Sequence, residues 1–134
     1  RIYQPSKATD VMPPVAVVVD TSGSCWDVAG RFMCAVARFH EDMRPERTIL
    51  ITCDATVHQV AVFERWEQVS LPTIEGGGGT DFRPALAEAD KHGACMTLFL
   101  TDMEGTFGEE PETPVTWLAC TDMEAPFGDT HRVW

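Results

Sequence analysis

Residues 15–19 form an uninterrupted apolar run that ends at the carboxylate of Asp20. A strand with one face in water would alternate polar and apolar residues, so this run predicts a strand that is buried on both faces. Such strands belong to parallel sheets covered by helices, and ligands bind at the carboxyl edge of those sheets. We therefore expect Asp20 to stand at a ligand-binding edge.

Two serines, Ser22 and Ser24, follow Asp20 at two-residue steps, with Gly23 between them to permit a tight turn. Three oxygens gathered in this way form a hard ligand set, which suits Mg²⁺ and could also take Mn²⁺ or Ca²⁺. The same five residues are also typical of a strand-to-helix turn with a helix N-cap. The motif alone leaves both interpretations open.

The apolar pattern after this motif predicts strands that alternate with helices. Residues 24–44 indicate an amphipathic helix that ends before a proline, and a glycine loop at 76–79 precedes a helix that Asp81 is expected to cap. Further strands are predicted over 48–53, 94–101, 115–120 and 131–134, with an antiparallel hairpin strand over 56–63. This order predicts an α/β fold with a mostly parallel, Rossmann-like sheet, one antiparallel edge strand and flanking helices.

Tracing the predicted strand directions brings three separate segments to one edge of the sheet. The glycine loop must return to this edge to begin its helix, and the strand over 94–101 ends there on a carboxylate. We therefore expect one metal site, built from Asp20, Ser22, Ser24, Thr80 and Asp102.

Composition limits the partners of this chain. Its formal net charge of −11 repels phosphate backbones, so we expect no nucleic-acid partner. No apolar run approaches the roughly 20 residues of a membrane helix, so we expect no membrane partner. The cysteines form no C-x-x-C pair, which predicts reduced thiols and a cytoplasmic protein.

We interpret residues 1–13 as a lead-in from a longer parent protein and residues 14–134 as the metal-binding domain.

Three motifs carry a resemblance to a known family. D-T-S-G-S at 20–24, G-G-T-D at 78–81 and T-D at 101–102 resemble the metal-ion-dependent adhesion site (MIDAS) of von Willebrand factor A (VWA) domains. The phrases G-G-G-G-T-D-F-R-P, T-D-M-E-G-T-F and A-P-F-G are most similar to the A-like domain at the carboxyl end of bacterial proteins labelled predicted metallopeptidases. Those proteins are often encoded beside AAA-type ATPases, so the resemblance implies an assembly with such an ATPase.

Two departures from the family pattern are visible. Residue 103 is Met where many A domains have Gly after the aspartate, which leaves the local turn open. No closing helix follows before Trp134, so the helix-displacement switch of integrin-type A domains is not carried over. The phrase T-D-M-E also recurs at 121–124, either by chance or as a second similar turn, and Asp122 is not assigned to the metal.

We predict a protein-binding module whose ion accepts a Glu or Asp from a partner protein. An ion held mainly by hydroxyls and water keeps most of its positive charge, so an incoming carboxylate can bind it strongly. The chain has no H-E-x-x-H motif, no P-loop lysine and no G-x-S-x-G elbow. The alternative that stays open is metal-dependent hydrolysis of a phosphate or peptide bond, with Glu104 or Asp81 as the general base.

Overall fold

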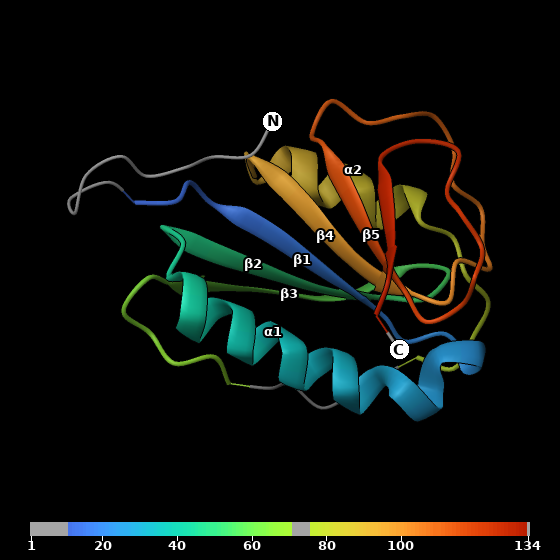
Figure 1. Ribbon diagram of the computed structural model, residues 1–134, viewed down its shortest axis with the longest axis horizontal. Coiled ribbons are helices and arrows are strands. Elements are labelled where there is room, and N and C mark those ends of the chain that lie inside the picture. Colours follow the sequence, from blue (N-terminus) through green and yellow to red (C-terminus); the bar gives the residue numbers. More distant parts are fainter. Residues whose placement is uncertain (1–10, 71–75, 134) are drawn as a thin grey trace.

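The computed structural model describes residues 11–70 and 76–133, apart from the side chains of Ser24 and Trp26. Within these ranges, six strands form one sheet in the order β3-β2-β1-β4-β5-β6 (Figure 1). Their bounds are β1 Val15–Asp20, β2 Arg47–Cys53, β3 Val57–Glu64, β4 Met96–Thr101, β5 Val115–Ala119 and β6 Asp129–Arg132. Neighbouring strands are parallel except β2 and β3, which are antiparallel. The predicted α/β fold with one antiparallel edge strand is confirmed.

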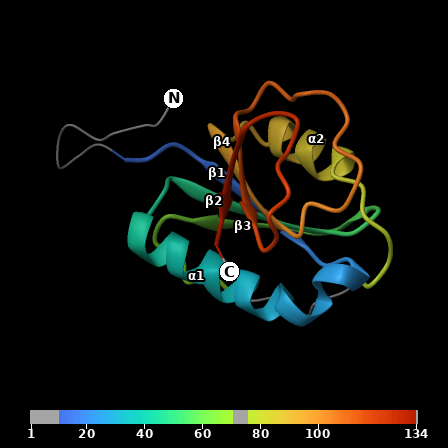
Figure 2. The same ribbon diagram turned by 45° about the vertical axis from the view of Figure 1, so that its right-hand side comes forward.

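The helices lie on opposite faces of this sheet (Figure 2). A 3-10 helix, η1 Gly23–Val28, leads into α1 Ala29–Met43, and α2 covers Arg83–Lys91. Alternate residues of β1 pack in two buried clusters, Val15, Val17 and Val19 with α1, and Ala16 and Val18 with α2. The apolar run is unbroken because helices cover both faces of β1. Within the described ranges, no helix has the length and apolar character needed to cross a membrane.

The helix predicted over 24–44 is wrong in its first turn. The Cys25 N–H donates to the Ser22 carbonyl at 3.0 Å, three residues back, which is the tighter 3-10 pattern. The α-helix begins only at Ala29. It ends as predicted before Pro45, where Arg44 takes the left-handed conformation with φ 47° and donates its N–H to the His40 carbonyl.

The last strand also differs from the prediction. β6 covers Asp129–Arg132 instead of 131–134, and Trp134 lies outside the described residues. This strand pairs with β5 alone and its residues are exposed or half-buried, so it carries no apolar pattern that would mark its bounds.

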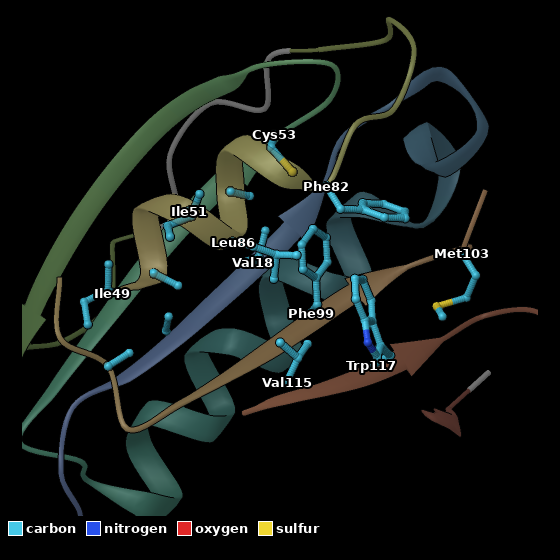
Figure 3. Packing of buried hydrophobic residues seen from close by; sticks show 14 of the residues in the cluster. Val18, Ile49, Ile51, Cys53, Phe82, Leu86, Phe99, Met103, Val115 and Trp117 are labelled. Atoms are coloured by element: carbon cyan, nitrogen blue, oxygen red, sulfur yellow. The ribbon is translucent and has the colours of Figure 1, made fainter. Parts of the chain in front are cut away.

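Aromatic rings fill the core on the α2 face (Figure 3). The Phe82 and Phe99 ring centroids lie 5.0 Å apart, and Phe99 stacks on Trp117 at 4.7 Å. The Trp117 indole N–H donates to the Phe127 carbonyl at 3.0 Å, so the buried polar atom is satisfied. Phe82 immediately precedes α2, and its burial therefore anchors the end of the glycine loop against β4 and β5.

Candidate metal centre

Asp20 is the last residue of β1, and its side chain is held from two directions. The Ser22 backbone N–H donates to Asp20 Oδ1 at 2.8 Å. The Thr101 hydroxyl, from the end of the neighbouring strand β4, donates to Asp20 Oδ2 at 2.5 Å. Asp20 is fully buried. Its carboxylate is therefore fixed in orientation at the carboxyl edge of the sheet before any ligand arrives.

Asp102 follows β4 at the same edge and is 4% exposed. Its Oδ1 accepts the Glu104 N–H at 3.0 Å, and its backbone carbonyl accepts the Thr121 hydroxyl at 2.7 Å. Hydrogen bonds from both sides thus hold this turn in place.

Met103 resolves the local turn that the sequence left open. It adopts φ 72°, a left-handed conformation that glycine takes without strain and other residues adopt at a cost of about 1–3 kcal/mol. Its N–H donates to the Thr101 hydroxyl at 3.1 Å, and its side chain is fully buried in the aromatic cluster. The Met therefore makes a glycine-like turn, and burial of its side chain offsets the strain.

The structure brings Asp20 and Asp102 together with Cys25. One potential ligand atom from each of these residues lies within 4.8 Å of the other two, and all three residues are buried. Cys25 was not among the ligands predicted from the sequence. The signal that could have found it is its place directly after D-T-S-G-S, where the 3-10 turn of η1 returns it to the carboxylates.

Burial raises the pKa of the Cys25 thiol well above its ordinary value, and the negative charges of Asp20 and Asp102 raise it further. Without a cation the thiol therefore stays protonated. The ion pairs of the described residues involve other carboxylates, so neither Asp20 nor Asp102 has a cationic partner there. Two neighbouring carboxylates without a counter-charge form a site that favours a cation.

The other predicted ligands are placed less closely. Ser22 is 1% exposed and lies between Asp20 and Cys25 along the turn, bonded to both through its backbone. The Ser24 side chain lies outside the described part of the structure. Thr80 is half-buried, and among the described residues its hydroxyl shows no hydrogen bond to Asp20 or Asp102.

Backbone hydrogen bonds place the glycine loop beside this edge. Gly77 N–H donates to the Thr21 carbonyl at 2.8 Å, and Gly23 N–H donates to the Gly78 carbonyl at 3.0 Å. Thr106 N–H donates to the Thr80 carbonyl at 3.4 Å. The loop that carries Thr80 therefore lies between the turn after β1 and the segment after β4, as strand tracing predicted.

Asp81 supports α2 in a different way from the expected N-cap. The capping position belongs to Phe82, and Asp81, one residue earlier, accepts the Arg83 backbone N–H at 3.0 Å. Its carboxylate also pairs with the Arg83 guanidinium at 2.8 Å, and hydrogen bonding from Arg83 lowers the Asp81 pKa. This hydrogen bonding outweighs burial, which on its own would raise the Asp81 pKa. A carboxylate held by a cation in this way is a weak general base.

A protein family and a solved structure both match this chain. The sequence matches the family described as VWA-like domain (DUF2201) over residues 15–133. The crystal structure of the ArnB paralog VWA2 from Sulfolobus acidocaldarius is similar with a TM-score of 0.64 at 14% identity, over 84% of this chain and 36% of that chain. This likeness concerns the fold alone, and this chain covers little more than a third of that protein's length. No match was found among curated proteins. Because the family match spans nearly all of the described sheet and helices, the chain belongs to the VWA-like domain (DUF2201) family.

Proposed function

We propose that this chain is a protein-binding module that depends on a divalent metal at a MIDAS-type site. The observation that carries the proposal is the meeting of Asp20 and Asp102, two buried carboxylates without a cationic partner among the described residues. They come from adjacent strands at the carboxyl edge of the sheet, where open α/β sheets bind ligands.

The ligand set proposed for the ion consists of Asp20, Ser22, Ser24, Thr80 and Asp102. Carboxylate and hydroxyl oxygens are the donors that Mg²⁺ prefers, and Mn²⁺ or Ca²⁺ would also be accepted. When bound, the ion would supply positive charge and an exchangeable position for an incoming carboxylate. The chain's own part is to hold Asp20 through Ser22 N–H and the Thr101 hydroxyl, so that the site needs little reorganisation.

The proposed partner is a protein that offers a Glu or Asp side chain to this edge. Exposed residues lie in the loops that contain or contact the buried carboxylates: Gly23, the glycine loop at 76–79 and residues 104–106. A rim of this kind leaves room for a protein surface. The resemblance to A-like domains of bacterial metallopeptidase-like proteins supports an ATPase-linked cytoplasmic assembly as the setting.

Affinity capture tests this proposal with three forms of the domain. The immobilised wild-type domain is presented to the source cell extract with Mg²⁺ and with EDTA, and Asp20→Ala is presented with Mg²⁺. Asp90→Ala is the matched control, because it removes an exposed carboxylate on α2. We expect a partner that is retained only by the metal-loaded wild-type and Asp90→Ala domains.

The hydrolase alternative makes the opposite prediction. Glu104 is exposed next to Asp102 and would be the base, since Asp81 is held by Arg83. Magnesium-dependent turnover of a generic phosphatase or peptidase substrate, lost in Glu104→Gln, would replace the binding module by an enzyme.

A further inference from the structure

Asp54 is a buried carboxylate that the proposed ligand set does not use. It follows β2 directly, and β2 ends beside the end of β1, where Thr21 N–H donates to the Cys53 carbonyl at 2.7 Å. The residue is 8% exposed. A hairpin turn does not by itself require a buried carboxylate at this position, so the contacts of the Asp54 side chain must account for its burial.

The Asp54 side chain reaches the glycine loop. Its Oδ2 accepts the Gly78 N–H at 3.2 Å, and its Oδ1 accepts the Thr56 N–H at 3.1 Å. His58 Nε2 lies 2.9 Å from Oδ1. Burial disfavours the charged form, but the facing His58 side chain and the hydrogen bonds from Thr56 and Gly78 outweigh it and lower the Asp54 pKa.

The Asp54 backbone reaches the same loop a second time. Its carbonyl accepts the Asp81 N–H at 3.1 Å. Gly78 and Asp81 are the residues on either side of the pair Gly79 and Thr80. One residue therefore holds both ends of the short segment that carries Thr80.

The loop approaches Asp54 closely enough that a side chain at one of its glycines would displace the carboxylate. A Cβ added at Gly78 would lie 2.9 Å from Asp54 Oδ2, whereas a Cβ added at Gly79 would meet nothing within 4 Å. Neither glycine has a positive φ, so an alanine is acceptable to the backbone at both positions. The two neighbouring glycines thus differ in their distance to the carboxylate.

We infer that Asp54 is a positioning residue, which fixes the glycine loop so that Thr80 is presented to the ion. His58 supports it by facing the carboxylate from β3. This inference rests on the proposed function, because it needs an ion at the Asp20–Asp102 edge. Residues that orient metal ligands without touching the metal typically change affinity by about 10–100-fold when replaced.

Gly78→Ala and Gly79→Ala form a matched pair for the test. Each adds one methyl group to the same loop, and only the first displaces the Asp54 carboxylate. Asp54→Asn and Asp90→Asn form a second pair, because Asp90 Oδ1 also accepts a loop N–H, that of Thr113, at 3.2 Å. Mg²⁺ affinity is measured by calorimetry on all four, and metal-free stability by urea unfolding in EDTA.

We expect Gly78→Ala and Asp54→Asn to bind Mg²⁺ about 10-fold or more weakly than wild type, and Gly79→Ala and Asp90→Asn to bind as wild type. The amide NMR signals of residues 78–81 should shift in the metal-free forms of the first two variants only. Wild-type affinity in a folded Gly78→Ala or Asp54→Asn domain would overturn the role of Asp54 while leaving the metal site intact. Absence of Mg²⁺ binding by the wild-type domain would instead remove the proposed function, and this inference with it.

Discussion

Two threonines at strand ends arrange the acidic residues of the site. The Thr101 hydroxyl donates to the Asp20 side chain, and the Thr121 hydroxyl donates to the Asp102 carbonyl. Each threonine also accepts the N–H of the methionine two residues later, Met103 at 3.1 Å and Met123 at 3.4 Å. The two copies of the T-D-M-E phrase therefore share a Thr–Met hydrogen bond near the ends of neighbouring parallel strands, but of the two methionines only Met103 has a positive φ. The aspartate of the second copy, Asp122, is exposed and pairs with Arg132.

The first prediction concerns the hydroxyl of Thr101. Thr101→Val leaves Asp20 Oδ2 and Met103 N–H without their partner, so we expect the free energy of unfolding to fall by about 1–3 kcal/mol. Thr97→Val, on the same strand, is the control, because the buried Thr97 hydroxyl has no hydrogen-bond partner among the described residues. That variant should be neutral or stabilising. Urea unfolding measures both, and equal losses would contradict the role given to Thr101.

Some residues of the candidate site could be predicted from sequence and others could not. Asp20 is the last residue of one apolar strand and Asp102 directly follows another, so their place followed from strand direction alone. Cys25 and Asp54 were not predicted as site residues, because Cys25 meets Asp102 and Asp54 meets Gly78 only in the folded chain. All five predicted ligands, Asp20, Ser22, Ser24, Thr80 and Asp102, stay predictions.

At the scale of elements, the loops of this edge are packed on one another. A Cβ on Gly105 would lie 2.8 Å from both the Phe82 ring and the Thr80 methyl group. The segment after β4 therefore leans directly on the end of the glycine loop. Sequence patterns identified both loops but contained no information on this contact, because it depends on the absence of a side chain.

The second prediction follows from that contact. Gly105→Ala should lower the free energy of unfolding by about 1–3 kcal/mol, since the new methyl group must push Phe82 or Thr80 aside. Gly30→Ala is the matched control near the start of α1, where a Cβ would meet nothing within 4 Å. It should stabilise the helix by about 0.5 kcal/mol. Denaturant unfolding of the two variants should therefore give opposite signs, and two losses of equal size would contradict the packing.

For the whole molecule, the strand order explains why the carboxylates meet. β1 pairs with β2 on one side and with β4 on the other, while α1 and α2 cover opposite faces. From β1 the chain adds strands on one side, β2 and β3, and then on the other side, β4 to β6. The strand order therefore reverses between β1 and β4, and Asp20 and Asp102 flank this switch point. Strand direction was predictable, but strand order was not, because all the buried parallel strands present similar apolar runs.

The third prediction is a loss of stability at alkaline pH. Burial raises the pKa of the Cys53 thiol well above its ordinary value, with nearby negative charges adding to the effect. The unfolded chain therefore loses this proton at lower pH than the folded domain. Stability is then full below the unfolded pKa and falls as pH rises above it, by about 1.4 kcal/mol per pH unit for one thiol.

Urea unfolding between about pH 7 and about pH 10 measures this slope. Cys53→Ala should fall less steeply than wild type, although its small cavity lowers stability at every pH. Parallel curves for the two proteins would show that the buried thiol does not contribute.

The central claim, a divalent ion held at the edge between β1 and β4, is tested most directly by calorimetric titration of the metal-stripped domain with Mg²⁺ and Mn²⁺. We predict one ion per domain, with binding lost in Asp20→Ala and in Asp102→Ala and retained in Asp90→Ala. Asp81→Asn should also retain binding, because an Asn oxygen can still accept the Arg83 N–H at the start of α2. No heat of binding in the wild-type domain, or unchanged affinity in Asp20→Ala, would contradict the claim.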